Sequence, residues 1–77
     1  MNRITLKING KIEYFNYREK VILCDIIKKF VKNYEKKNIA IAVNNNLITK
    51  KDWYLKKLEN NDAIEIVMPF PGGWYKK

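Results

Sequence analysis

The first part of the chain alternates between apolar and polar side chains with a period of two, which is typical of half-buried strands. Residues 3–8 place three apolar side chains on one face, and residues 11–17 resume the alternation. Between them stands Asn9-Gly10, the dipeptide best suited to the positive-φ positions of a type I′ turn. The pattern therefore predicts a β-hairpin over residues 3–17.

From Val21 to about Lys36 the apolar residues recur at spacings of three and four, which is the period of a helix. They form one stripe, made of Leu23, Ile26, Ile27, Phe30, Val31 and Tyr34. Lysines occupy the opposite face, while no Ser, Thr or Asp stands at a clear N-cap position. We predict one amphipathic helix over residues 21–36.

The second half returns to short apolar runs. Residues 39–43 are small or β-branched, as in an interior strand, and three asparagines at 44–46 predict a turn before a short strand at 47–48. Residues 63–69 alternate again, with Ile64, Ile66 and Met68 on one face, and predict the last strand.

The segment between these strands, residues 50–62, is mostly polar. Trp53, Leu55 and Leu58 are its apolar side chains, and we expect them to pin a turn or a single helical turn to the core. A structural role for Trp53 follows from the large area that an aromatic ring buries.

The order of elements is strand, strand, helix, strand, short strand, strand. The one helix must cover one face of a mixed sheet, because nothing else in the chain can bury its apolar stripe. The pattern predicts an α+β protein with the β-grasp architecture, built on a mixed sheet of four to five strands and one main helix.

The composition argues against several kinds of catalytic and metal site. A chain of 77 residues has room for one core but little room for a deep enclosed active site. Histidine is absent, which removes the usual general base and most zinc sites. The single cysteine, Cys24, lies in the helical pattern and is interpreted as a core residue in a reducing compartment. We expect no enzyme activity, no metal and no bound cofactor.

No apolar run approaches the roughly 20 residues that span a bilayer, and the N-terminus passes straight into a strand pattern. We therefore expect no membrane partner and a cytoplasmic location, or the plastid stroma if an A/T-rich organelle genome encodes the chain.

The net charge of +8 raises the question of a nucleic-acid partner. Fourteen of the sixteen basic residues are lysine, whereas sequence-reading proteins favour arginine. The chain is also rich in asparagine and isoleucine, which share A/T-rich codons with lysine. A biased genome explains this composition, so we expect no nucleic-acid partner.

Two adjacent glycines, Gly72 and Gly73, follow the last predicted strand and precede Trp74-Tyr75-Lys76-Lys77. A glycine pair is a narrow strip of backbone that fits a tight enzyme cleft. The alternative is a plain glycine turn before a frayed end. We divide the chain into a β-grasp domain over residues 1–71 and a flexible Gly-Gly tail with a short extension over residues 72–77.

These motifs and their order resemble the ThiS family, the ubiquitin-like β-grasp sulfur carriers of thiamine biosynthesis. The resemblance runs from Ile4 to Gly73 and includes Asn9-Gly10, a helix opening at 23–27, a strand at 39–44, Trp53, a turn at 58–62, a strand at 64–67 and the pair Gly72-Gly73. Two features depart from the family. Asn61 stands where a glycine is usual, although asparagine can adopt the same backbone angles, and four residues follow Gly73, where members of the family end.

The resemblance implies a function and its partners. A ubiquitin-activating-like adenylyltransferase would use ATP to adenylate the Gly73 carboxylate, and a sulfur donor protein would displace AMP to leave a thiocarboxylate. Thiazole synthase would then take the sulfur for the thiazole moiety of thiamine. Phe70, Pro71, Gly72 and Gly73 would enter the active sites of these partners. Since the Gly73 carboxylate must be free, residues 74–77 would have to be removed first.

Three other functions stay open at this point. The small subunit of molybdopterin synthase shares the fold, the Gly-Gly end and the thiocarboxylate chemistry, although Trp53 and the short chain favour the thiamine pathway. Precursors of ubiquitin-like modifiers also carry residues that mask a Gly-Gly pair. A β-grasp interaction module with a vestigial Gly-Gly is the third alternative.

Overall fold

The computed structural model describes the backbone of residues 1–70 and 73–76 and the side chains of residues 1–68. Within this part of the chain the elements are β1 (Asn2–Ile8), β2 (Lys11–Tyr17), α1 (Leu23–Phe30), η1 (Tyr34–Lys36), β3 (Ala40–Val43), β4 (Asn46–Ile48), η2 (Lys50–Asp52), β5 (Ala63–Phe70) and β6 (Gly73–Lys76). The two η elements are short 3-10 helices.

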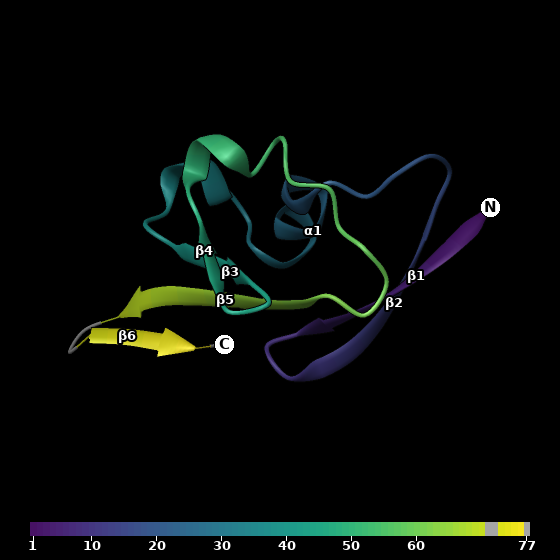
Figure 1. The fold of residues 1–77 in the computed structure, drawn as a ribbon. Helices are drawn as coiled ribbons and strands as arrows, with labels where there is room; N and C mark the ends of the chain where they lie inside the picture. Colours follow the sequence, from purple (N-terminus) through teal and green to yellow (C-terminus); the bar gives the residue numbers. More distant parts are fainter. Residues whose placement is uncertain (71–72, 77) are drawn as a thin grey trace.

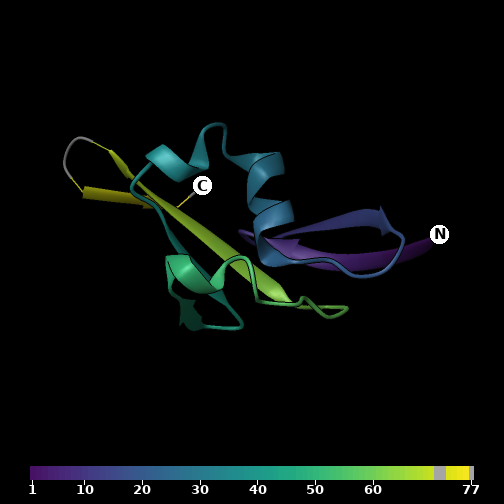
Figure 2. The same cartoon turned by 90° about the horizontal axis from the view of Figure 1, so that it is seen from above.

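Five of the strands form one mixed sheet in the order β2-β1-β5-β3-β4, and β6 pairs with β5 outside this path. The β1–β5 pair is parallel, and the other pairs are antiparallel. Helix α1 lies across one face of the sheet (Figures 1 and 2). The predicted α+β, ubiquitin-like β-grasp fold is therefore confirmed, and β6 is a strand that the sequence did not predict.

One apolar core lies between the helix and the sheet. Leu6 of β1, Ile27 of α1, Ile41 of β3 and Ile64 of β5 are fully buried, so the core joins the three inner strands to the helix. Each fully buried aliphatic side chain contributes about 1.5–3 kcal/mol relative to an exposed one. This core contains the apolar side chains that alternate along β1 and β5, together with those of the apolar stripe of α1.

The predicted hairpin is confirmed. Asn9 and Gly10 both have positive φ, at 49° and 85°, which is the backbone of a type I′ turn. Phe15 and Tyr17 are half-buried against the core, whereas the opposite face of β2 is open to solvent.

The helix is shorter than predicted. The expected helix over residues 21–36 is instead α1, which ends at Phe30, followed by the separate turn η1. Val31 is extended and Asn33 is left-handed with φ at 56°, so the helical ladder cannot continue through them. Val31 and Tyr34 still reach the core, but Phe30 is 39% exposed, so its expected place in the buried stripe was only partly right.

The segment before β5 also differs in one respect. Trp53 and Leu58 are buried as expected, and the indole Nε1 donates a hydrogen bond to the carbonyl of Ile48 at 3.0 Å. Leu55 is 75% exposed, which contradicts its predicted place in the core. The amides of Leu55 and Lys56 both bond to the carbonyl of Asp52, and this tight turn leaves Leu55 on the outside.

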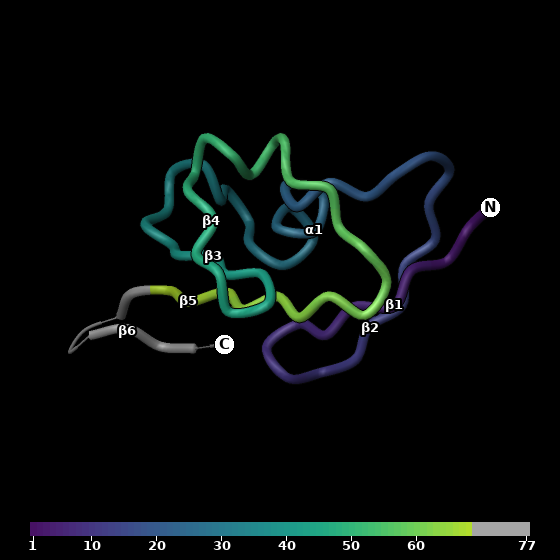
Figure 3. The backbone as a smooth tube through the Cα atoms, viewed as in Figure 1, coloured from purple at the N-terminus to yellow at the C-terminus, as the bar shows by residue number. Residues whose placement is uncertain are grey.

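The smooth trace of the backbone shows the long connection before β5 curving down to β1, beside which β5 begins (Figure 3). Asn61, in that connection, has φ at 72°, the backbone conformation expected for the position that is usually glycine. Within the described residues, no helix is long and apolar enough to cross a membrane.

Candidate functional site: the end of β5 and the glycine pair

The start of β5 is clamped by asparagine at the turn after β3. The backbone amide of Asn44 donates to the carbonyl of Ala63 at 2.7 Å, and its side-chain oxygen accepts from the amide of Ala63 at 2.9 Å. The side-chain amide of Asn44 donates to the carboxylate of Asp62 at 2.9 Å. Together with the pairing to β3, these bonds fix where β5 begins.

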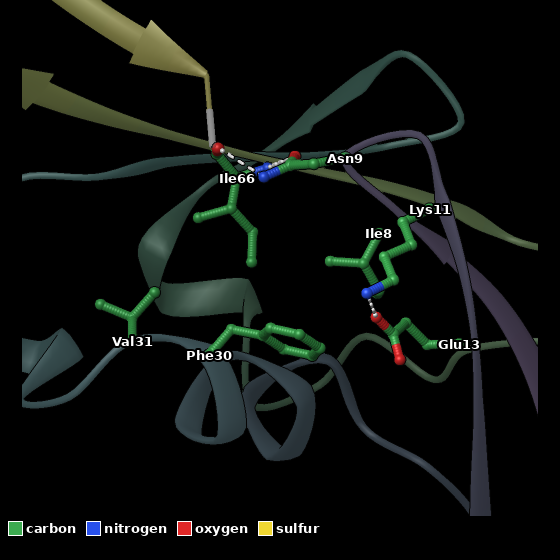
Figure 4. Close-up of a pocket in the computed structure, with 7 residues that line it drawn as sticks. All are labelled: Ile8, Asn9, Lys11, Glu13, Phe30, Val31 and Ile66. Atoms are coloured by element: carbon green, nitrogen blue, oxygen red, sulfur yellow. Dashed lines mark hydrogen bonds and ion pairs between the residues drawn. The ribbon is translucent and has the colours of Figure 1, made fainter.

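A second asparagine, Asn9, holds the middle of β5 from the other edge. Its backbone amide donates to the carbonyl of Ile64 at 2.9 Å. Its side-chain oxygen accepts from the amide of Ile66 at 2.7 Å, and its side-chain nitrogen donates to the carbonyl of Ile66 at 3.3 Å (Figure 4). The side-chain amide of Asn9 thus forms the hydrogen bonds to β5 that the backbone of a further β1 residue would form. These bonds fix β5 as far as Ile66.

The strand then leads to the predicted functional residues. Phe70 is the last residue of β5 and Gly73 is the first residue of β6, and the two are paired across the hairpin. Pro71, Gly72 and Lys77 lie outside the described residues. Residues 73–76 therefore form a strand where we expected a flexible tail. The division of the chain at residue 71 stays a prediction. The roles expected of Phe70, Pro71, Gly72 and Gly73 stay predictions as well.

Cys24 lies in α1, away from this end of β5, and is buried at 8% exposure. Burial raises the pKa of its thiol, with a smaller contribution from the nearby carboxylate of Asp25. A buried thiol with a raised pKa is a poor nucleophile, because the thiolate is the reactive form. The interpretation of Cys24 as a core residue is confirmed.

A hollow of about 350 Å³ lies beside the Asn9–Ile66 bonds, on the helix side of the sheet (Figure 4). Ile8, Ile66, Phe30 and Val31 give it apolar walls, and Lys11 and Glu13 form an ion pair at 3.9 Å beside it. The sequence did not predict this hollow or the role of Asn9, because both depend on contacts between β1 and β5, which lie more than fifty residues apart in the chain.

The described residues do not bring together three His, Cys, Asp or Glu side chains that could hold a metal ion. What the site offers is a strand, fixed along its first half, that delivers a glycine pair.

Comparison with known proteins agrees with this geometry. The family model of the ThiS family matches residues 6–73, so the match ends at the second glycine. No curated protein matches the chain at a significant level.

Among solved structures, the chain is similar to the crystal structure of the thiamine biosynthesis protein ThiS from Geobacter metallireducens. The two share 18% sequence identity and superpose with a TM-score of 0.74, over 91% of this chain and 100% of that one. At this identity the similarity shows the fold. Because the family model covers nearly the whole chain, the protein belongs to the ThiS family of small sulfur carriers in thiamine biosynthesis.

Proposed function

We propose that Gly73 is the residue that carries sulfur, and that it does so only after residues 74–77 have been removed. The observation that supports this most is the position of the family match, which ends at Gly73, three residues after the end of β5 in the sequence. In the sequence, the Gly73 carbonyl is bound in an amide to Trp74. An amide has no carboxylate oxygen to attack ATP, so hydrolysis of this bond has to precede activation.

The steps that follow are those expected of the family. The freed carboxylate attacks the α-phosphate of ATP in a ubiquitin-activating-like adenylyltransferase, and pyrophosphate leaves. A persulfide on the donor protein attacks the acyl carbon of the adenylate and AMP leaves, which gives an acyl disulfide between Gly73 and the donor. A second thiol of the partner proteins then attacks the donor's sulfur in that disulfide, forms a new disulfide with it and releases Gly73 as a thiocarboxylate. Thiazole synthase is the proposed acceptor. ATP binds to the partner enzyme, and the carrier supplies the carboxyl carbon of Gly73 that is activated.

Glycine at 72 and 73 suits this role because a Cβ would widen the strip where it approaches the nucleotide. Truncation after Gly73 is compatible with folding, since all buried apolar residues of the described side chains lie between Ile4 and Ile66. The truncated chain therefore keeps every buried apolar side chain of the part that the structure describes.

The test compares the full chain with the chain truncated after Gly73, each mixed with ATP and the adenylyltransferase from the same cells. We expect the truncated chain to support ATP–pyrophosphate exchange and the full chain not to. Changing Gly73 to Ala in the truncated chain should slow the exchange, whereas Asn45→Ala, in a distant turn, should not. Equal activation of the full and truncated chains would contradict the proposal.

The intact mass of the protein from its native cells provides a second measurement. It reports both the loss of residues 74–77 and the exchange of one oxygen for sulfur. Conjugates of higher mass, with Gly73 joined to lysines of other proteins, would instead indicate a protein modifier.

A further inference from the structure

The main-chain groups of β5 on the edge that faces β1 bind different partners along the length of the strand. Alternate residues of a strand direct their N–H and C=O groups to the same edge. Ile64 and Ile66 direct theirs toward β1, where the backbone and the side chain of Asn9 bind them (Figure 4). At the same spacing, Met68 and Phe70 direct their main-chain groups to this edge, beyond the reach of β1.

Strand β6 covers this part of the edge. Val67 is paired with Ala40 of β3 and also with Lys76 of β6, so β6 lies on the side of β5 opposite β3. That is the side of β1. The register places Tyr75 opposite Met68 and Gly73 opposite Phe70. Figure 1 shows β6 running back along the end of β5.

The opposite edge of β5 is closed to a further strand. The carbonyl of Ala63 accepts from the amide of Asn44, which shows that the odd-numbered residues face β3. Pairing with β3 ends at Val67, and the next residue that faces this edge is Pro69, which has no N–H to donate. The end of β5 can therefore accept a strand on one edge only.

We propose that the main-chain groups of Met68 and Phe70 form a docking edge for an extended segment of the activating enzyme, and that β6 is the internal strand that occupies this edge until residues 74–77 are removed. The proposal rests on the function proposed above and adds how the partner binds. Unpaired strand edges recruit extended segments through main-chain hydrogen bonds. A strand joined to β5 by a short connection competes strongly with an external one, because its effective concentration is high.

Removal of residues 74–77 would then have two consequences at once. It frees the Gly73 carboxylate, and it empties the docking edge, since the one remaining β6 residue cannot form a strand. The uncut chain is thereby blocked in binding as well as in chemistry.

The first experiment measures amide hydrogen exchange, residue by residue, in the full chain and in the chain truncated after Gly73. We expect the amides of Met68 and Phe70 to be protected in the full chain and to exchange at least about tenfold faster after truncation. The amide of Val67 faces β3 and should stay protected in both, which controls for loss of the fold. Rapid exchange at Met68 and Phe70 in the full chain would overturn the proposal.

The second experiment adds the adenylyltransferase to the truncated chain. We expect the two amides to become protected again. If the enzyme binds and activates Gly73 while both amides stay unprotected, the docking edge is wrong and the proposed function stands. If the enzyme neither binds nor activates the truncated chain, the proposed function fails, and with it the enzyme as occupant of the edge. Protection that grows with the concentration of the truncated chain alone would show that a second copy occupies the edge.

A matched pair of variants tests the hydrogen bond itself. Met68→Pro removes the N–H from the docking edge, and Met68→Ala loses the same side chain but keeps the N–H. We expect truncated Met68→Pro to bind the enzyme roughly 3- to 10-fold more weakly than truncated Met68→Ala, which is the effect of one lost hydrogen bond. Protection of the Val67 amide verifies that both variants are folded. Equal affinity of the two variants would contradict the docking edge.

Discussion

Asparagine does at several turns what glycine does in many other proteins. Five asparagines have φ between 49° and 72°, namely Asn9, Asn33, Asn44, Asn45 and Asn61. Asparagine tolerates the left-handed region better than other residues with a Cβ, so these turns form with little strain. Unlike glycine, it also brings a side chain that can bind, and Asn9 and Asn44 use theirs to hold β5.

This difference leads to a prediction at Asn9. Changing Asn9 to Gly keeps the positive φ but removes both side-chain bonds to Ile66. We expect the free energy of unfolding to fall by about 1–2 kcal/mol, as measured by urea denaturation. Asn45→Gly is the matched control, because Asn45 has φ at 70° and its side chain makes no hydrogen bond with the described residues. Equal losses in the two variants would contradict the bracing role of Asn9.

At the scale of the elements, the sequence predicted the features that depend only on residues close together in the chain. The Asn9-Gly10 turn was evident because its backbone conformation follows from two residues. The apolar stripe of α1 was evident because a period of three to four is specific to a helix. The end of the helix was missed, since Val31 and Asn33 can each continue a helix or leave it, and only tertiary packing decides between the two.

The errors and omissions in the candidate site have the same physical origin. Leu55 was placed in the core because its spacing from Trp53 and Leu58 does not show which side of a turn it occupies. Strand β6 and the bonds between Asn9 and Ile66 join parts of the chain that the sequence pattern cannot connect. The assignment of the glycine pair stays a prediction, which the sequence supplies because a glycine pair is a local motif.

The buried face of α1 leads to a prediction about how this element packs on the sheet. Ile27 is fully buried in α1, and its replacement by alanine should lower the free energy of unfolding by about 2–5 kcal/mol. Alanine keeps the helix propensity, so the loss measures packing. Phe30→Ala is the control in the same helix, because Phe30 is 39% exposed and should cost less despite its larger side chain. A larger loss at Phe30 than at Ile27, read from thermal or urea unfolding, would contradict the observed packing.

For the whole molecule, the buried core and the residue proposed to carry sulfur lie in different parts of the chain. The buried apolar side chains of the described residues run from Ile4 to Ile66, and the residue that we propose carries sulfur, Gly73, follows them in the sequence as the first residue of β6. In the function that we propose, folding and chemistry therefore place few demands on the same residues. On the docking proposal, the β-grasp body keeps its structure while the end of β5 exchanges β6 for a segment of the activating enzyme.

The charge of the molecule provides the last prediction. If the net charge of +8 reflects a genome rich in lysine codons, the protein should bind DNA or RNA only through general attraction to phosphate. Fluorescence anisotropy with labelled oligonucleotides should then show weak binding that falls steeply between about 50 and 200 mM salt, because counterion release drives it. Oligonucleotides of different sequence should bind alike, since only Arg3 and Arg18 supply the forked donor that reads bases best. Tight, salt-resistant binding to one defined sequence would instead show that the lysines were selected for a nucleic-acid partner.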